Sequence, residues 1–167
     1  MDTERTQERG RRNERGYSLS ELLTVIALMG LFILFGGPAM ADAFKAYKVK
    51  AGADIVATDV RGMRYAAVGN RTSLTMTTST QSSGTNPNTY VFTNAAGNTI
   101  TRRLESGVNL ENGSAATISF TTTGSTGSTA TQVLIVSMDI NSTRGDRYTI
   151  SVSPTGTVTT AYATYTP

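Results

Sequence analysis

The sequence predicts an α+β fold in which a long N-terminal helix, membrane-spanning in its first half, packs on a C-terminal antiparallel β-domain. Residues 22–41 contain no charged side chain. Apolar residues then recur at spacings of three and four up to Ala67, with no turn signal in between. From Asn70 onward, short runs rich in β-branched residues alternate with clusters of turn-forming residues.

The composition argues against an enzyme. The chain of 167 residues has no His, which is the commonest general base and transition-metal ligand, and no Cys. Only eight acidic residues follow the first sixteen positions, and no nucleophile paired with a base is recognisable. We therefore expect no catalytic residue, no metal and no cofactor.

The chain divides into three expected segments. Residues 1–16 form a polar leader with five Arg and four acidic residues, and this leader lacks the apolar stretch of an ordinary secretory signal. Residues 17–69 form the helix, and residues 70–167 form an extracytoplasmic β-domain.

The first half of the helix is expected to span a membrane, over about residues 20–41. Twenty uncharged residues at about 1.5 Å each cover the hydrocarbon thickness. A buried core helix is the alternative, but the rest of the chain is too small and too polar to enclose it. The basic leader keeps the N-terminus cytoplasmic, so the β-domain lies on the other side of the membrane.

The second half of the helix is expected to be amphipathic and to end at Gly69-Asn70. Its charged residues fall mostly on the other faces of the helix. The apolar stripe that should face the β-domain consists of Val49, Ala53, Val56, Val60, Met63 and Ala67.

Seven strands are expected in the β-domain, because turn clusters such as NAAGN, TGSTGS and SPTG separate the apolar runs. The strands are predicted at residues 73–77, 89–93, 98–104, 116–122, 131–139, 147–153 and 156–162.

A motif stands at the start of the apolar run: Gly16, then Tyr17, then Glu21 as the fifth residue counted from Tyr17. This motif resembles the type IV prepilin signature. The resemblance implies that a prepilin peptidase cuts between Gly16 and Tyr17 and methylates the new N-terminus at Tyr17. Tyr17 replaces the commoner Phe, and Ser20 stands where an aliphatic residue is usual.

The position of Glu21 has a physical rationale. A charged side chain within a membrane costs about 2.5 to 3.5 kcal/mol on insertion scales, so it normally has a partner or a function. Cleavage creates an α-ammonium group that a neighbouring subunit can present to Glu21, and in the pilin family this pairing is thought to guide subunit assembly. The alternative is a plain signal anchor in which Glu21 extends to the water interface.

Pro38 is the twenty-second residue counted from Tyr17, where many pilins also carry proline. Proline removes a helix hydrogen bond, and Gly30, Gly36 and Gly37 each weaken the same stretch by about 1 kcal/mol relative to Ala. The resemblance implies that the helix bends or unwinds here in assembled filaments. Ordinary use of glycine in membrane helices is the alternative.

The segment 60–76 and the two closing strands resemble minor pseudopilins of the GspH/FimT type. This resemblance implies a structural subunit of a type II secretion pseudopilus that works with prepilin peptidase, other pilin or pseudopilin subunits, an inner-membrane assembly platform and membrane lipid. The alternatives are a minor pilin of a type IV pilus and a membrane-anchored adhesin-like module with its ligand at loops 78–89. The residues that carry the resemblance are Arg64, Ala66, Ala67, Asn70 and Leu74, with Gly124 and Gly156 at turns.

Neither a nucleic-acid-binding site nor a calcium loop is expected. In the DNA-uptake branch of this family the C-terminus is arginine-rich, but residues 156–167 contain no basic residue here, and no nucleic-acid partner is expected. Residues 139–146 (DINSTRGD) place oxygen ligands at alternating positions, but the glycine falls one place late and no distal glutamate follows, so a hairpin turn is expected rather than a calcium loop. Arg102, Arg103, Arg144 and Arg147 are expected to be strand-edge or loop residues.

Overall fold

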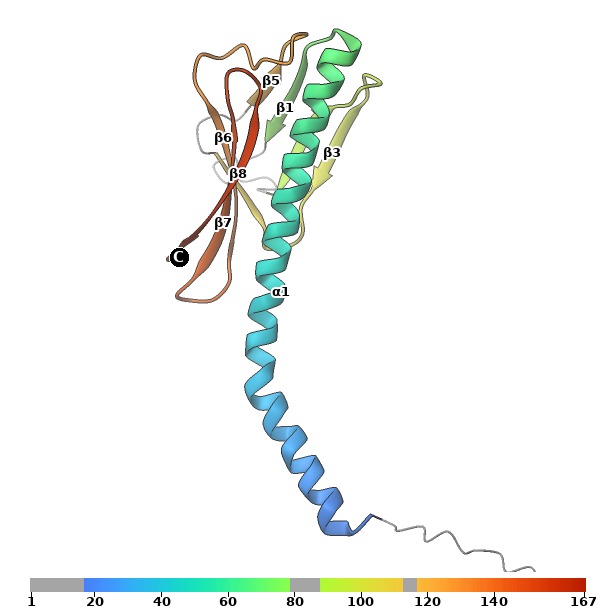
Figure 1. The fold of residues 1–167 in the computed structure, drawn as a ribbon, viewed down its shortest axis with the longest axis vertical. Helices are drawn as coiled ribbons and strands as arrows, with labels where there is room; N and C mark the ends of the chain where they lie inside the picture. Colours follow the sequence, from blue (N-terminus) through green and yellow to red (C-terminus); the bar gives the residue numbers. More distant parts are fainter. Residues whose placement is uncertain (1–16, 79–87, 113–116) are drawn as a thin grey trace, which may run out of the picture. The chain divides into compact units, whose positions relative to one another are not determined.

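The computed structural model describes residues 17–78, 88–112 and 117–167, and it contains one long helix and two antiparallel sheets (Figure 1). Helix α1 runs from Leu19 to Asn70 and has 52 residues. The chain divides into two compact units, the first ending at Ala39 and the second comprising residues 40–167.

The eight strands form two four-stranded sheets, which confirms the predicted α+β class. Sheet A has the order β3-β2-β1-β5, and sheet B has the order β4-β6-β7-β8. All neighbouring strands within each sheet are antiparallel. Sheet A consists of β1 (Leu74–Thr78), β2 (Thr89–Thr93), β3 (Thr99–Arg103) and β5 (Thr117–Phe120), and sheet B of β4 (Asn109–Asn112), β6 (Gln132–Asp139), β7 (Gly145–Val152) and β8 (Val158–Tyr165).

Strand β4 is not predicted by the sequence pattern, and strand β8 begins two residues later than predicted. Strand β4 reads NLEN and contains a single apolar residue, Leu110, so it carries no alternating pattern. Its strand conformation comes from pairing with β6, in the register Leu110 to Val136. Strand β8 begins at Val158 because Gly156 forms the turn that precedes it, with a φ of 82°.

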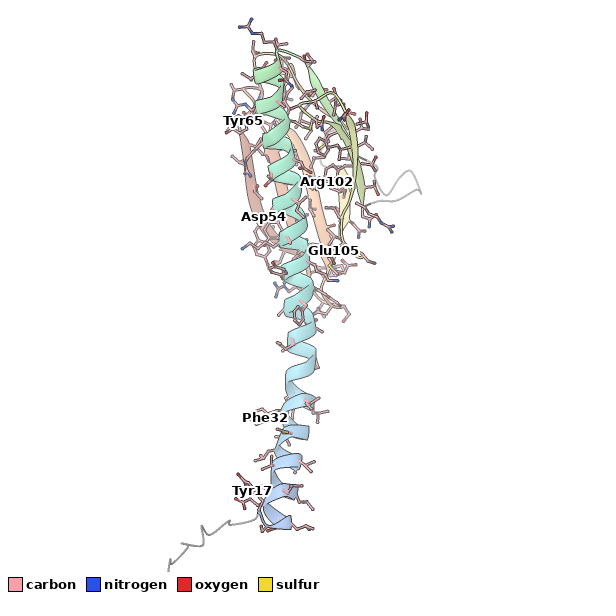
Figure 2. The ribbon with its side chains drawn as sticks, turned by 90° about the vertical axis from the view of Figure 1, so that its right-hand side faces the viewer. Tyr17, Phe32, Asp54, Tyr65, Arg102 and Glu105 are labelled. Atoms are coloured by element: carbon pink, nitrogen blue, oxygen red, sulfur yellow. The ribbon has the colours of Figure 1, made fainter. Side chains whose placement is uncertain are left out.

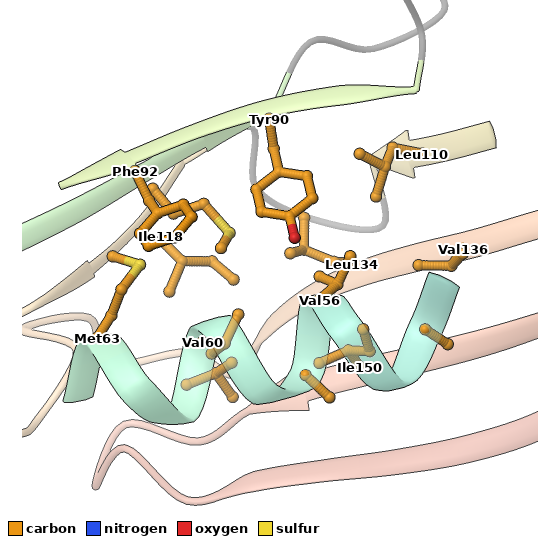
Figure 3. Close-up of a cluster of buried hydrophobic side chains, with 14 of the residues drawn as sticks. Val56, Val60, Met63, Tyr90, Phe92, Leu110, Ile118, Leu134, Val136 and Ile150 are labelled. Carbon is orange, nitrogen blue, oxygen red and sulfur yellow. The ribbon is translucent and has the colours of Figure 1, made fainter. Parts of the chain in front are cut away.

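The hydrophobic core of the second unit lies between the C-terminal part of α1 and both sheets (Figure 3). The predicted apolar stripe of the helix is confirmed, since all six of its residues are buried. Gly52 and Ala57 lie on the same buried face. Exposed Asp54 and Tyr65 lie on other faces of the helix, and Arg102 of β3 lies beside it (Figure 2). The largest fully buried side chains from the sheets are Tyr90, Phe120, Met76, Ile118, Leu110, Leu134 and Ile150.

Helix α1 ends in a Schellman motif. The Thr72 N–H donates to the Ala67 carbonyl at 3.1 Å, and the Arg71 N–H points to the Val68 carbonyl at 3.4 Å. Arg71 has a φ of 51°, in the left-handed region. The expected stop at Gly69-Asn70 is therefore correct in position, but the residue that turns the chain is Arg71, where glycine is the usual choice.

Replacing Arg71 with glycine is expected to raise the free energy of unfolding by about 0.5 to 1 kcal/mol. The left-handed conformation costs a residue with a Cβ roughly 1 to 2 kcal/mol, and the entropy of glycine in the unfolded chain offsets part of that gain. Urea unfolding of the full chain in detergent, followed by tyrosine signals because the chain has no Trp, measures the change. Arg61→Gly, on an exposed face inside the same helix, is the control and should lower stability by about 1 kcal/mol. A loss of stability in Arg71→Gly would contradict the strain argument.

Candidate assembly site

Glu21 lies in the first turn of α1, where Ser18 caps the helix. The Ser18 hydroxyl accepts a hydrogen bond from the Glu21 N–H at 3.2 Å, and the Ser18 carbonyl accepts from the N–H groups of Glu21 and Leu22 at 3.0 and 3.1 Å. The sequence SLSE at 18–21 is the S-x-x-E pattern of a capping box, a local signal for the helix start that is absent from the predictions above. A carboxylate in this turn is also favoured by the positive end of the helix dipole.

The apolar residues after Glu21 are uncovered. Every described side chain from 17 to 41 is exposed, and Phe32 and Phe35 keep 76% and 72% of their surface. Within the described residues, α1 is the one helix long and apolar enough to cross a membrane, with a mean hydropathy of 2.2 in its most apolar window. A core helix would be buried by its own chain, so that alternative is wrong here. A signal sequence passes the same test of length and composition, so the plain signal anchor stays open.

Pro38 and the three glycines lie within continuous helix. Helix α1 includes Pro38, and a Cβ added at Gly30, Gly36 or Gly37 would meet no atom within 4 Å. Nothing in the described chain therefore requires glycine at these three positions. The bending or unwinding that the resemblance implies concerns assembled filaments and stays a prediction.

Arg64 joins two turns of the β-domain to the helix. Its Nε donates to the Gly124 carbonyl at 3.1 Å and its Nη2 to the Thr155 carbonyl at 3.3 Å. Next to Thr155, Gly156 packs so closely that an added Cβ would lie 1.9 Å from the Gly124 carbonyl oxygen and 2.8 Å from Arg64 Nε. The structure thus brings together Arg64, Gly124 and Gly156, three residues that the sequence resemblance singled out separately.

Asp59 on α1 connects the helix to sheet A. Its Oδ2 accepts a hydrogen bond of 2.6 Å from the Tyr90 hydroxyl and lies 2.8 Å from Arg102 Nε. Tyr90 is fully buried, and burial together with the Asp59 hydrogen bond raises the pKa of its hydroxyl far above the ordinary range. No sequence pattern predicts this connection, because Tyr90 and Arg102 lie 31 and 43 positions away from Asp59.

The segment 139–146 is a hairpin turn, as predicted. Asn141 Oδ1 accepts from the N–H and hydroxyl of Thr143 and from the N–H of Arg144, at 2.9 to 3.0 Å. Asp146 is buried and accepts two hydrogen bonds from Arg144, at 2.9 and 3.0 Å. These oxygens are therefore used within the turn. The described part of the chain contains no cluster of three or more potential metal-ligating side chains.

The same turn is tied to α1. Lys45 Nζ donates to the Ile140 carbonyl at 2.6 Å, and Asn141 Nδ2 donates to Asp42 at 3.0 Å. Arg102 and Arg144 are both in salt bridges with carboxylates, so two of the four arginines that were expected at strand edges or in loops serve the fold. The loop proposed for an adhesin ligand, 78–89, lies mostly outside the described residues.

The free energy of unfolding is expected to fall as the pH rises from about 10 to about 12. Burial, and then the hydrogen bond that its hydroxyl donates to Asp139 at 2.5 Å, raise the pKa of Tyr165 from 10.0 to about 12. The unfolded chain thus loses this proton first, so the stability that the group contributes is complete below pH 10 and is lost through pH 12. Urea unfolding at several pH values measures this. Between about pH 10 and pH 12, the free energy of unfolding should fall less steeply in Tyr165→Phe and in Asp139→Asn than in the unaltered chain. An unchanged slope in both variants would contradict this assignment.

An uncovered apolar helix that continues into an antiparallel β-domain defines a pilin-like α+β fold. Among solved structures, the chain is similar to the type IV minor pilin FimU of Pseudomonas aeruginosa in two crystal forms. One has a TM-score of 0.54 at 11% identity, covering 70% of this chain and 90% of the FimU chain in that crystal structure. The other has a TM-score of 0.51 at 12% identity, covering 67% and 91%. At this identity the likeness concerns the fold.

The sequence comparisons add no family assignment. No protein-family model matches the chain, and no curated protein matches it either. The GspH/FimT subtype therefore rests on the motifs described above.

Proposed function

We propose that this chain is a minor pilin-like structural subunit that is stored in the inner membrane and built into a filament through its N-terminal helix. The uncovered apolar surface of α1 carries this proposal, because residues 22–41 bury nothing within the chain and need lipid or neighbouring helices around them. The pilin-like fold of the remainder supports it. Its partners are then membrane lipid, other pilin or pseudopilin subunits and an inner-membrane assembly platform.

Prepilin peptidase would release the leader by cutting between Gly16 and Tyr17 and would methylate Tyr17. The cut places an α-ammonium group immediately before the Ser18 cap, at the positive end of the helix dipole, where a nearby carboxylate is stabilising. Co-expression with a prepilin peptidase followed by intact-mass measurement tests the proposal. Loss of residues 1–16 with one added methyl group is the expected result, and a mature chain that still begins at Met1 would refute it.

Glu21→Ala is expected to insert in the membrane as well as the unaltered chain but to be incorporated into filaments several-fold less. Removing the carboxylate lowers the insertion cost, so a defect in assembly cannot come from poor insertion. Carbonate extraction measures insertion, and immunoblotting of sheared filaments measures incorporation. Ser18→Ala is the control for the cap, because it disturbs the same turn and keeps the charge. Normal incorporation of Glu21→Ala would exclude the charge-pairing role.

We place the filament in type II secretion, on the H-type resemblance of residues 60–76 and the closing strands. A type IV pilus is the second candidate, favoured by the likeness to the minor pilin FimU. Deleting the major subunit of each filament in the native host, and asking which deletion abolishes extraction of this chain from the membrane, separates the two.

A further inference from the structure

Within residues 17–78, 88–112 and 117–167, sheet B has two edge strands, β8 and β4, each paired on one side only. Strand β8 has eight residues, none of them charged, and most of its side chains are exposed. Exposed edges are usually protected by charges, proline or a bulge, but β8 contains no proline and pairs with β7 without interruption. Its free edge is thus a template for another strand.

The register shows which backbone groups of β8 face outward. The Ser153 N–H donates to the Thr157 carbonyl, so the odd-numbered residues of β8 bond to β7. The even-numbered residues therefore direct their N–H and C=O groups away from the sheet. Their side chains lie on the core side, because their partners in β7 include buried Ile150 and Val152. The outward residues are Val158, Thr160, Tyr162 and Thr164.

The direction of β8 excludes an antiparallel pair of β8 strands within one membrane. The turn before β7 contacts Lys45, and the turn before β8 contacts Arg64, so β7 runs with α1 and β8 runs against it. Two β8 strands paired antiparallel would therefore point the two helices in opposite directions. A partner in the same membrane that pairs antiparallel with β8 must present an edge strand that runs with α1.

Strand β4 meets both conditions, because it is an edge strand of sheet B and runs in the same direction as α1. It is antiparallel to β6, which is antiparallel to β7, so β4 runs with α1. The Ile140 N–H donates to the Arg144 carbonyl, so even residues of β6 bond to β7 and odd residues bond to β4. The backbone N–H and C=O groups of Leu110 in β4 consequently point away from β6, toward the free edge. Its side chain is fully buried on the core side. When β4 joins β8, the core faces of both sheets lie on the same side.

We propose that β8 of one copy pairs antiparallel with β4 of a second copy, so that sheet B continues from subunit to subunit. Centring the shorter strand on the longer one places Asn109 opposite Ala163 and Glu111 opposite Ala161. Exposed Arg147 lies opposite Ala163 within its own sheet, one strand from the new edge. Glu111 and Arg147 then lie on the same outer face, above small alanine side chains, with complementary charges.

This inference rests on the proposed function, because it names the partner of a filament subunit. The contact is heterologous, with different surfaces on the two copies, and such contacts repeat into helical filaments when they do not close. Both helices point the same way, as two subunits of one membrane require.

The absence of Cys makes the contact testable by single substitutions in the full chain. Asn109→Cys and Ala163→Cys are co-expressed in one membrane and oxidised. They should yield a disulfide-linked dimer, because opposed residues outside the hydrogen-bonded pairs have Cα atoms about 4.5 Å apart. Asn109→Cys with Thr159→Cys is the matched control. Thr159 lies on the same face of β8 but roughly 13 Å along the strand, so this mixture should give at least five-fold less dimer.

Two results would overturn the proposal: no dimer in the first mixture, or equal dimer in both mixtures. A dimer from Ala163→Cys alone would show β8 against β8 and would also overturn it. Intact mass on the same membranes reports leader removal. Correct processing without the cross-link therefore rejects this contact and leaves the filament role standing, whereas an uncut leader rejects the filament role itself.

Discussion

Gly156→Ala is expected to lower the free energy of unfolding of the β-domain by about 3 to 4 kcal/mol. Two costs combine. A residue with a Cβ at a φ of 82° costs roughly 1 to 2 kcal/mol. The new methyl group would also lie 1.9 Å from the Gly124 carbonyl oxygen, which belongs to the backbone and cannot rotate away. Overpacking of this kind typically costs a further 1 to 3 kcal/mol.

Gly97→Ala separates these two costs. Gly97 has nearly the same φ, 81°, but nothing lies within 4 Å of an added Cβ. Only the cost of placing a residue with a Cβ at a positive φ applies at Gly97. The free energy of unfolding is therefore expected to fall by about 1 to 2 kcal/mol. Urea unfolding of the full chain in detergent, followed by tyrosine signals, measures both variants. Equal losses at the two positions would show that the turns near Arg64 can move apart. The close packing of Gly156 against the Gly124 carbonyl would then not contribute to stability.

The sequence was sufficient for the helix, for its buried stripe and for most strands. The stripe from Val49 to Ala67 is buried because apolar residues at spacings of three and four lie on one helix face, and this property is local. Strand β6, predicted at 131–139 and found at Gln132–Asp139, is long and apolar enough to be recognised by itself. Where the pattern is local and repeated, the prediction succeeded.

The contacts between elements could not be predicted in this way. The separation into two sheets depends on which strands pair, and nothing in β5 shows that it joins β1 rather than β6. The Asp59 connection links positions far apart in the chain. Arg64 and Gly156 were noted one by one from a family resemblance, and only the structure shows that they meet. At the candidate site, the S-x-x-E capping pattern is local, so the Ser18 cap is predictable from the sequence alone.

Asp59→Ala is expected to destabilise the chain by about 3 kcal/mol, chiefly through Tyr90. The Tyr90 hydroxyl is fully buried and would lose its acceptor, and an orphaned buried group costs about 1 to 3 kcal/mol. Asp59 also pairs with Arg102, but the Arg102 side chain is 48% exposed, so water screens that ion pair. Asp59 is 12% exposed and keeps its hydrogen bond from Tyr90 when Arg102 is removed. Exposed ion pairs contribute about 0 to 1 kcal/mol, and Arg102→Ala, which removes the exposed partner, should cost about 1 kcal/mol, less than Asp59→Ala.

A double-mutant cycle distinguishes the two partners of Asp59. Tyr90→Phe removes the hydroxyl, so the Asp59→Ala background then leaves no tyrosine hydroxyl at position 90 without an acceptor. The double variant should then be more stable than the sum of the single losses implies, by about 1 to 2 kcal/mol. The same cycle is measured with Asp59→Ala and Arg102→Ala. If the losses from Asp59→Ala and Tyr90→Phe are additive, and the coupling between Asp59 and Arg102 is the larger one, then the ion pair holds the helix to sheet A and the hydrogen bond does not. The opposite pattern is expected because the hydroxyl lies in the core, where no water replaces its acceptor, whereas the guanidinium of Arg102 keeps water around it.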